Sequence, residues 1–446
     1  MTATDQARQS LVIEAGCDAW DEARVAWNLA VDQQPAAVMP AASTADVVDA
    51  FALAHARGWR VAAQGTGHNP APLGSLTDTL LVKTAPMREV SVDPDLRRAR
   101  TGGGALWGDV ATAAGAHGLA PLAGSSADVG VVGYTLGGGL SWLGRLHGLA
   151  SNSVTAIEVV TPDGVVRHAD NTSEPDLFWA LRGGGGSFGV VTALEFTLYP
   201  LPTVYAGQLM WPLEQAADVL LAWRRWAETL DRTTSTCVRL LRLPPLPEIP
   251  EPLRGGEFVS VEVAHADVTN GAAVVAPMRG LAPLMDLVHE APATALMGLH
   301  MDPDHPVPGA GAGALLTGLP DAAVDSLLTT CGPGSDCSVL SVEIRRLGGA
   351  LAEPPAGAGA IGGLDAAYLC FAVGMAPPPA IPGVVTQVEQ AVAATGPWHA
   401  TTNYLNFVER PTDPGRLWPA PVLARLREVS DRYDPAGMMH SNHPLR

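Results

Sequence analysis

The sequence has little charge for its length. Only 16% of its 446 residues are Asp, Glu, Lys or Arg, against about 25% in an average soluble domain. The 45 acidic residues outnumber the 27 basic ones, which gives a net charge of −18. Binding to nucleic acid or to an anionic membrane surface requires a basic patch. The composition therefore argues against both kinds of partner.

Cysteine is also scarce. The five cysteines are scattered without a CxxC pair, at Cys17, Cys237, Cys331, Cys337 and Cys370. An odd number with no such spacing indicates neither a disulfide framework nor a zinc site. The longest uncharged stretch, 129–144, is too short and too rich in glycine for a membrane span of about 20 residues. The opening MTATDQARQSLVIEAG lacks the pattern of a secretory signal, so we expect a soluble cytoplasmic protein.

Glycine is abundant, with 48 residues, and apolar residues make up 47% of the chain. The length predicts two or three folding units. Three glycine clusters lie in the first half, at 65–67, 130–139 and 183–189. Glycine lets backbone N–H groups approach a ligand closely and form concavities that bind anions. An acidic chain can therefore hold a pyrophosphate through its backbone rather than through cationic side chains.

The glycine clusters do not match the usual nucleotide motifs. None is a GxGxxG after a first strand with an acidic residue about 20 positions later, and no GxxxxGK[ST] occurs. This argues against a Rossmann site and excludes a P-loop. Two further glycine-rich stretches, 309–318 and 352–363, are predicted to be flexible loops without chemistry.

The segment 36–62 predicts a strand, a helix and a second strand, with Ser43 as the N-cap of the helix and Gly58 just past its end. Further predicted elements are a helix over 105–118, a hairpin over 153–169, a helix, glycine loop and strand over 176–201, strands within 257–266, 338–351 and 366–375, and helices over 213–230, 321–330 and 420–432.

His68 directly follows Gly67 in QGTGHNP. The neighbouring glycines are expected to expose its imidazole on a loop that faces a cofactor. An imidazole can act as a nucleophile toward an activated methyl group of a ring cofactor. An ordinary surface or core histidine is the alternative interpretation.

Several segments occur in the order of one family's motifs and cover nearly the whole chain. They are QGTGHNP (64–70), VGVVGYTLGGGLSWLGRLHGL (129–149), DLFWALRGGGGSFGVVT (176–192), EIRRLGGAL (343–351), NYLNF (403–407) and RYDPAGMMHSNHPL (432–445). Together they resemble the berberine-bridge-enzyme-like branch of the vanillyl-alcohol-oxidase flavoproteins, with a PCMH-type FAD-binding domain. Within that branch, the chain is similar to FAD-linked oxidases of the 6-hydroxy-D-nicotine oxidase type.

The resemblance implies FAD, joined covalently to His68. Other residues that it implies in FAD binding are Gln64, Gly65, Thr66, Gly67, Asn69, Gly124, Ser125, Val129, Gly130, Gly133, Tyr134, Gly138, Gly139, Gly189, Val190, Asn406 and Asn442. The first loop would wrap the pyrophosphate, the segment 124–139 would pass along the isoalloxazine, and Gly189 would lie near the adenine. Tyr134 stands where many relatives have histidine.

Ser126 matches the position at which many relatives carry a second, cysteinyl flavin link. We therefore expect a single covalent bond, and with it a lower flavin potential than in doubly linked relatives. Val129 matches the family position beside the oxygen-reactive carbon of the flavin. A small residue there is associated with oxygen access, which favours an oxidase over a dehydrogenase; a plain core valine is the alternative.

In NYLNF, Tyr404 and Asn406 match a flavin-facing element of the family. Tyr404 is the first candidate for the catalytic base or a substrate hydrogen bond, and a tyrosine of an apolar sheet without chemistry is the alternative. A tyrosine base needs a neighbouring cation to lower its pKa. Strand alternation in VEIRRLGG places Glu343 and Arg345 on one face and Arg346 on the other. Either arginine is a candidate to stabilise a tyrosinate or bind an acidic substrate, and a sheet-edge arginine is the alternative for both.

His440 and His443 have the spacing of metal ligands but no acidic or cysteine partner nearby in the sequence, so we expect no metal site. The resemblance instead places them in the family's Asn-His ending, where Asn442 supports the FAD domain.

We predict an α+β fold with two domains. The FAD-binding domain covers 1–203, with its core at about 34–203, and a C-terminal segment, 400–446, returns to it. The substrate domain, 204–399, is expected to be an antiparallel sheet covered by helices.

The expected function is that of an FAD-dependent oxidase acting on a CH–OH or CH–NH group of a small molecule, with O2 as electron acceptor and H2O2 as product. The alternatives are an oxidative cyclase or dehydrogenase of secondary metabolism and a non-catalytic flavoprotein that binds a ligand. We expect a monomer or a homodimer.

Overall fold

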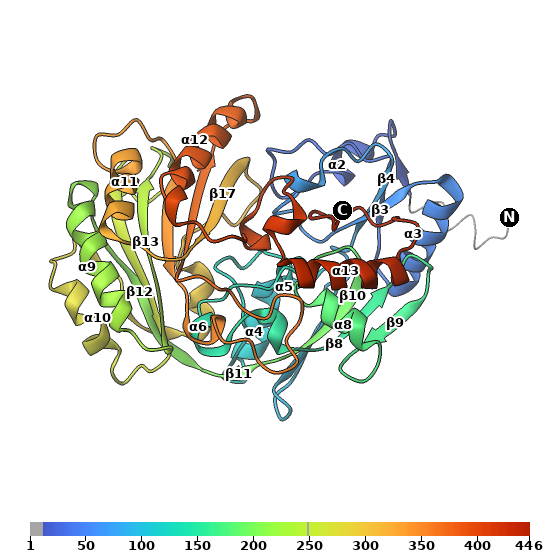
Figure 1. Cartoon of the computed structure of the whole chain (residues 1–446), viewed down its shortest axis with the longest axis horizontal. Coiled ribbons are helices and arrows are strands. Elements are labelled where there is room, and N and C mark those ends of the chain that lie inside the picture. The colour runs from blue at the N-terminus through green and yellow to red at the C-terminus, as the bar shows by residue number, and fades with distance from the viewer. Residues whose placement is uncertain (1–11, 248) are drawn as a thin grey trace.

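The computed structural model describes residues 12–247 and 249–446. Figure 1 shows two halves side by side, each built on β-sheet, with the C-terminal helix lying across the half that contains the N-terminus. Among the described residues, no helix has the length and apolar character needed to cross a lipid bilayer.

The first half contains a small mixed sheet with the strand order β1-β2-β4-β3. Its strands are β1 (Ile13–Glu14), β2 (Ala37–Pro40), β3 (Arg60–Gln64) and β4 (Thr79–Lys83). Helix α3 (Thr44–Arg57) connects β2 to β3, and both of its predicted ends are confirmed. The Ser43 side chain accepts a hydrogen bond from Asp46 N, and Gly58 follows the helix with a φ of +65°. The helix buries Val47, Phe51 and their neighbours against this sheet.

A second, antiparallel sheet in this half has the order β5-β6-β10-β8-β9. Its strands are β5 (Val90–Asp93), β6 (Arg98–Gly102), β8 (Val154–Val160), β9 (Val166–Ala169) and β10 (Val190–Thr197). The predicted hairpin is therefore β8–β9. A short pair, β7 (Leu119–Ala120) with β11 (Tyr199–Pro200), lies beside it. The helices of this half are α2 (Trp20–Ala23), α4 (Trp107–Gly115), α5 (Val131–Leu136), α6 (Gly144–His147), α7 (Ala150–Ser153), α8 (Pro175–Leu181) and α13 (Ala420–Tyr433).

The second half is one antiparallel sheet, with the order β15-β12-β14-β13-β18-β19-β17 and with β16 also paired to β12. Its strands are β12 (Thr203–Pro212), β13 (Thr234–Arg242), β14 (Glu257–His265), β15 (Met285–Asp286), β16 (His289–Pro292), β17 (Gly309–Leu316), β18 (Ser341–Arg346) and β19 (Tyr368–Met375). Its helices are α9 (Ala216–Thr229), α10 (Gly271–Arg279), α11 (Asp321–Cys331) and α12 (Ile381–Ala393).

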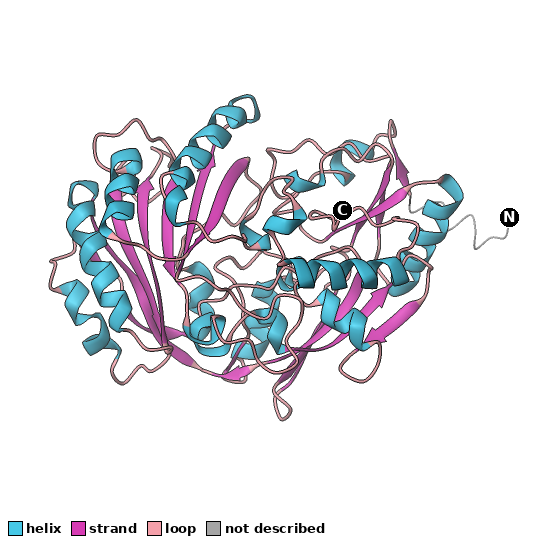
Figure 2. Ribbon diagram, in the orientation of Figure 1, coloured by secondary structure: helices cyan, strands magenta, loops and turns pink. Residues whose placement is uncertain are grey.

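The two faces of this sheet have opposite character. Figure 2 shows the helices gathered on the face away from the first half. Side chains such as Val238, Val261 and Ile344 point toward these helices and form the apolar core beneath them. Because strand residues alternate between faces, the residues between them point toward the first half. These include Arg239, Glu262 and other charged residues, so the sheet presents a polar face to the first half. The predicted antiparallel sheet covered by helices is confirmed.

The chain after α13 returns to β3. Val61 N donates to Met438 O at 2.9 Å, and His440 N donates to Val61 O at 2.8 Å. These bonds place residues 438–440 parallel to β3, directly beside the loop that follows it.

One sequence prediction is wrong. The stretch 309–318 was expected to be a flexible loop, but Gly309–Leu316 is strand β17, paired along its length with β19. Its glycines are needed because neighbours lie close on one side. A Cβ on Gly311 would lie 2.6 Å from Glu409 Oε1, and one on Gly313 would lie 2.7 Å from Phe407 O. Glycine here serves close packing rather than flexibility.

Gly313→Ala is therefore expected to lower the free energy of unfolding by about 1–3 kcal/mol, the typical cost of overpacking. The control is Gly318→Ala, because no described atom lies within 4 Å of its Cβ position. Urea unfolding of both variants checks this, and equal stabilities would contradict the close-packing explanation.

Candidate functional site

The loop 64–69 follows β3 and is held by backbone hydrogen bonds from a distant segment. Trp27 N donates to Thr66 O at 3.0 Å, and Asn28 N donates to Gly67 O at 3.1 Å. Gly67 has a φ of +83°, and a Cβ there would lie 2.2 Å from Gln64 Nε2. Glycine is thus required at this position, both by backbone conformation and by the neighbouring side chain.

The His68 imidazole is fixed on three sides. It stacks on Trp27 with ring centroids 4.1 Å apart, and its Nδ1 shares a 2.7 Å hydrogen bond with Thr66 Oγ1. Its Nε2 lies 3.5 Å from Asp128 Oδ1. Nε2 is buried and has no hydrogen-bond partner within the described part of the chain. This nitrogen is therefore available to an incoming group.

Asp128 completes this arrangement, although sequence reasoning did not single it out. It accepts hydrogen bonds from Trp27 Nε1 at 2.5 Å and from Ser126 Oγ at 2.8 Å. Burial disfavours ionisation of the carboxyl group, but His68 and these donors outweigh burial and lower the pKa of Asp128 to about 2. An ionised carboxylate therefore lies beside the imidazole at neutral pH.

The loop also contains unpartnered polar atoms that point to a polar ligand. Gln64 Oε1, His68 Nε2 and Asn69 Oδ1 are buried without a hydrogen bond to any described residue. Buried polar atoms are normally paired, so three on one loop mark a place for a polar group. The backbone around them is anchored, since Asn69 Nδ2 donates to Val408 O at 2.9 Å and Asn442 Nδ2 donates to Asn69 O. Asn442 thus supports the loop.

The second glycine segment lies against the first. A Cβ on Gly130 would lie 3.7 Å from Thr66 Cγ2. The Tyr134 ring fits between Gly124 and Gly139, whose Cβ positions lie 3.1 Å and 2.5 Å from its ring carbons. Its hydroxyl donates to Leu122 O at 3.1 Å. Tyr134 is therefore packed between glycines, with its hydroxyl bound to the backbone.

The remaining predicted cofactor residues divide into two groups. Ser125, Val129 and Gly133 lie on or just before α5, near the first loop, and Val129 O accepts a hydrogen bond from Trp107 N at 3.0 Å. Gly189 and Val190 lie farther along, at the start of β10, where Val190 pairs with Val160.

Tyr404 and Asn406 contact the second glycine segment from the returning chain. Asn406 Nδ2 donates to Tyr134 O at 2.9 Å. The Tyr404 hydroxyl lies 2.9 Å from the Cβ position of Gly138, and it is buried without a hydrogen-bond partner among residues 12–247 and 249–446. Burial raises the pKa of Tyr404. Burial therefore disfavours the expected tyrosinate, and the role of Tyr404 as a base or as a hydrogen-bond donor stays a prediction.

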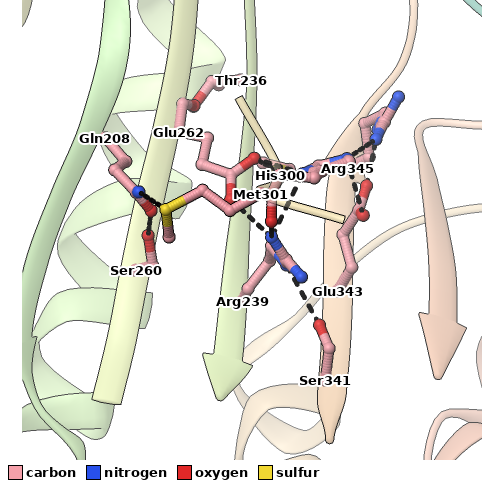
Figure 3. A network of polar contacts seen from close by, with 11 residues as sticks. Gln208, Thr236, Arg239, Ser260, Glu262, His300, Met301, Ser341, Glu343 and Arg345 are labelled. Carbon is pink, nitrogen blue, oxygen red and sulfur yellow. Dashed lines mark hydrogen bonds and ion pairs between the residues drawn. The ribbon is translucent and has the colours of Figure 1, made fainter. Parts of the chain in front are cut away.

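The polar face of the large sheet carries a buried cluster of charged residues, drawn in Figure 3. We call Arg239, Glu262, His300, Glu343 and Arg345 the charged cluster. Arg239 Nη1 donates to Glu262 Oε1 at 2.8 Å, and Arg345 Nε donates to Glu343 Oε1 at 2.5 Å. His300 lies between the two pairs, and all five residues are at most 8% exposed.

His300 links the two pairs. Its Nε2 lies 2.6 Å from Arg345 Nη2, and its Nδ1 lies 2.5 Å from Glu262 Oε2. Burial alone would raise the pKa of Glu262, but His300 and Arg239 lower it to about 2. The cluster thus combines two arginines and two glutamates around the imidazole of His300.

Arg345 Nε donates to Glu343, and Arg345 Nη2 contacts His300. The role expected for Arg345 beside a tyrosinate or an acidic substrate stays a prediction. Arg346 points to the other face of the strand, as predicted, and lies 5.1 Å from the centroid of the Tyr368 ring. It is therefore not part of the charged cluster.

Trp142 connects the charged cluster to the FAD-binding part. The Arg345 guanidinium lies 4.8 Å from the centroid of the Trp142 ring, and the His300 ring lies 5.3 Å from it. Trp142 belongs to the same glycine-rich segment as Tyr134. Burial raises the pKa of Tyr134, with a further contribution from Tyr404 and an opposing one from Arg345. The cluster and the two tyrosines therefore share one electrostatic environment.

Cys237, His300 and Glu343 place one ligand atom each within 4.8 Å of one another. The donors of Arg345 already take the lone pair of His300 Nε2 and one Glu343 oxygen. This group is therefore an ion-pair network rather than a cation site. His440 is likewise satisfied, by Thr79 Oγ1 at 2.9 Å and Leu73 O at 2.8 Å.

Comparison with known proteins shows that the first two glycine clusters, at 65–67 and 130–139, lie in a domain that other proteins share. Residues 35–170 match the family described as FAD binding domain. The chain is 33% identical over 210 residues to (R)-6-hydroxynicotine oxidase from Paenarthrobacter nicotinovorans, covering 47% of this chain and 46% of that protein. It is 35% identical over 235 residues to glucooligosaccharide oxidase from Sarocladium strictum, covering 50% and 46%. The matches thus span about half the length of these curated relatives.

Solved structures share the whole fold. The wild-type BBE-like 1 protein of Physcomitrella patens superimposes with a TM-score of 0.84 at 19% identity, covering 100% of both chains. The 6-hydroxy-D-nicotine oxidase of Arthrobacter nicotinovorans gives a TM-score of 0.78 at 23% identity, covering 97% of each chain. The expected resemblance and the α+β fold are confirmed.

Glu262→Gln tests the charge balance of the cluster. It leaves Arg239 without its buried anion and is expected to lower the free energy of unfolding by about 3–5 kcal/mol. The pKa of Glu262 in the folded state, about 2, lies below its ordinary value of 4.5. The stability that ionised Glu262 contributes to the folded protein is therefore fully present above about pH 4.5 and is lost as the pH falls toward 2. Over this pH range, the free energy of unfolding of the variant should fall less than that of the unchanged protein.

Glu257→Gln is the matched control, because Glu257 is mostly exposed and lies 3.7 Å from Arg242 Nε. An exposed pair contributes about 0–1 kcal/mol. Chemical unfolding at a series of pH values measures both variants. Equal effects at the two positions would show that the cluster does not depend on its internal charge balance.

Proposed function

We propose that this chain, which carries an FAD-binding domain within a fold shared with berberine-bridge-enzyme-like proteins, is an FAD-dependent oxidase of a small molecule. One observation carries the proposal: His68 Nε2 is buried without a hydrogen bond to the described residues, inside the matched domain, on a loop anchored from three distant segments. That loop, with its neighbouring unpartnered oxygens, fits a polar cofactor held partly by backbone and partly by a covalent bond.

The bound FAD would supply an acceptor for a hydride from a CH–OH or CH–NH group and pass the electrons to O2, which gives H2O2. His68 would be its single covalent anchor. Loop 64–69 would bind the pyrophosphate, and the segment 124–139 would lie along the ring system. Ser126, whose hydroxyl donates to Asp128, offers no thiol for a second link.

We assign the substrate's proton to the charged cluster rather than to Tyr404. Tyr404 is buried and keeps its own proton, so it can donate a hydrogen bond to a substrate oxygen or nitrogen. Glu343 faces the FAD-binding part from the large sheet, and Arg345 Nε binds only one of its two carboxylate oxygens. Proton transfer requires such an acceptor within reach of the substrate. The cluster also excludes water, since its members are buried.

The oxidase assignment has two supports. Val129 is a small residue at the position that the family resemblance associates with oxygen access. The two curated relatives described above are both named oxidases, one of 6-hydroxynicotine and one of a glucooligosaccharide. Their different substrates leave two candidate substrate classes for this chain, an amine and a sugar that is oxidised at a hydroxyl-bearing carbon.

His68→Ala is expected to abolish acid-stable flavin. In the unchanged protein, the yellow colour should remain with the protein pellet after acid precipitation, because a covalent bond survives unfolding. In the variant, the flavin should move to the supernatant. Absorbance at flavin wavelengths and fluorescence in a denaturing gel measure the two fractions.

His117→Ala is the control, since His117 is an exposed histidine of the same domain. It should retain the covalent flavin in full. Flavin that stays attached to the His68→Ala protein would disprove the anchor assignment.

Tyr404→Phe is expected to slow reduction of the flavin by substrate roughly 2- to 12-fold, which corresponds to one lost hydrogen bond of about 0.5–1.5 kcal/mol. A metabolite panel of amines and sugars identifies the substrate by bleaching of the flavin under nitrogen. Stopped-flow absorbance then measures reduction and, after mixing with air, reoxidation. The reoxidation rate should not change, because the substituted hydroxyl does not act on O2.

The same assay distinguishes the other functions. Rapid reoxidation in air with release of H2O2 supports the oxidase. Slow reoxidation would replace it with a dehydrogenase, and a product with a new ring would replace it with an oxidative cyclase. A protein whose flavin no ligand of the panel bleaches would be a binding protein.

A further inference from the structure

The outer edge of strand β17 is bound by side chains instead of by another strand. β17 is the last strand in the order of the large sheet, beside β19. In Figure 1 it lies on the side of that sheet nearest the first half. Both backbone groups of Gly309 and the N–H of Gly311 form hydrogen bonds with the side chains of Asn28 and Glu409. A bare strand edge would leave these backbone groups unpaired.

Asn28 joins β17 directly to the loop 64–69. Its Nδ2 donates to Gly309 O at 3.0 Å, and its Oδ1 accepts from Gly309 N at 3.2 Å. Its own backbone N–H donates to Gly67 O at 3.1 Å. Asn28 is only 7% exposed. One buried residue therefore holds the strand through its side chain and the loop through its backbone.

The residues on either side of Asn28 extend this connection in both directions. Leu29 N donates to Val307 O at 3.1 Å, just before β17 begins. On the other side, the Trp27 ring stacks on the His68 ring with centroids 4.1 Å apart. A displacement of β17 is therefore passed through three consecutive residues to the imidazole that we expect to carry the cofactor.

Val408 and Glu409 make a second connection between the same two elements. Glu409 Oε2 accepts from Gly311 N at 2.6 Å, and Val408 O accepts from Asn69 Nδ2 at 2.9 Å. A Cβ on Gly311 would lie 2.6 Å from Glu409 Oε1, so glycine permits this close approach. Because Val408 and Glu409 are neighbours in the sequence, the strand and the loop are again bound to one short segment.

We propose that Asn28 and Glu409 are positioning residues that together hold the large sheet at a fixed distance from loop 64–69, and we call them the clasp. β17 pairs with β19, and β19 pairs with β18, the strand that carries Glu343 and Arg345. Since a hydrogen-bonded sheet moves as a rigid element, the clasp sets where the charged cluster lies relative to the cofactor. A displacement of about 1 Å can lower a reaction rate about 100-fold.

The proposal rests on the proposed function only for the reaction that the clasp serves. The contacts of the clasp join protein groups to one another, so the coupling between strand and loop is measurable without any substrate. The effect on the reaction is measured separately.

Hydrogen exchange of the flavin-loaded protein, followed by mass spectrometry, tests the coupling. Glu409→Ala removes the acceptor of Gly311 N, and the peptide that contains β17 should exchange roughly 2- to 12-fold faster, the effect of one lost hydrogen bond. If the clasp couples the two elements, the peptide that contains Trp27 and Asn28 should also exchange faster. Glu409→Gln keeps an acceptor and should leave both peptides as in the unchanged protein.

Asn28→Ala tests the effect on the reaction. It removes both side-chain bonds to Gly309, and the limiting rate of flavin reduction in the stopped-flow assay should fall roughly 10- to 100-fold. The substrate concentration that gives half of the limiting rate should not change, because the clasp does not bind substrate. Asn28→Asp keeps the acceptor for Gly309 N and loses only the donor, so its rate should be intermediate. This variant also carries the kinetic test if Asn28→Ala does not fold.

Asn152→Ala is the matched control. Asn152 also joins distant segments, because its Nδ2 donates to Gly362 O at 2.8 Å, but that bond involves neither β17 nor the loop 64–69. The control should change neither the exchange of the β17 peptide nor the limiting rate of flavin reduction. A cooperative unfolding transition verifies that each variant is folded.

Three results would overturn the proposal. They are unchanged exchange at Trp27 and Asn28 in Glu409→Ala, an equal loss of rate in Asn152→Ala, and a higher half-saturating substrate concentration at an unchanged limiting rate in Asn28→Ala. The exchange measurement separates the clasp from the proposed function. If Glu409→Ala speeds exchange at Trp27 and Asn28 while no compound of the panel reduces the flavin, the clasp holds and the oxidase proposal fails.

Discussion

The loop 64–69 must keep buried polar atoms free for a ligand, and the rest of the first half is arranged to permit this. A loop with unpartnered buried groups is unstable unless its backbone bonds are satisfied elsewhere. Here the N-terminal segment binds Thr66 O and Gly67 O, while Asn442 and Val408 bind the backbone and side chain of Asn69. The site is thus preorganised by segments that are hundreds of residues apart in sequence.

The second half differs from the first because its large sheet buries charged side chains. A buried ion that loses its partner is costly, and the charged cluster avoids this cost by pairing two arginines with two glutamates around His300. One face of the sheet is apolar and packs against its helices, and the other face carries these charges. The sheet therefore contributes both to the core of its own half and to the polar side of the site. Trp142 then joins that wall to the glycine segment of the first half.

The sequence predicts much of this arrangement, because short-range signals decide it. The Ser43 and Gly58 ends of α3, the β8–β9 hairpin and the alternation of Glu343, Arg345 and Arg346 follow from local chemistry. Glu262 could also have been noticed, because it is a carboxylate between two valines inside the apolar strand 257–266. No sequence pattern pointed to His300, because it lies on a loop and reaches the cluster only through tertiary packing. The stretch 309–318 was mistaken for a loop because glycine required by close neighbours is indistinguishable, in one sequence, from glycine that gives flexibility.

The hydrogen bond from Asn442 to Asn69 spans 373 residues, and this has a consequence for biosynthesis. During translation, the first half emerges with β3 and its loop long before residues 438–442 exist. Val61 then lacks its partners Met438 and His440, and the loop lacks the amide that closes it. The cofactor loop is therefore completed only after residues 438–442 have been synthesised, so a chain that lacks them is expected to hold FAD poorly.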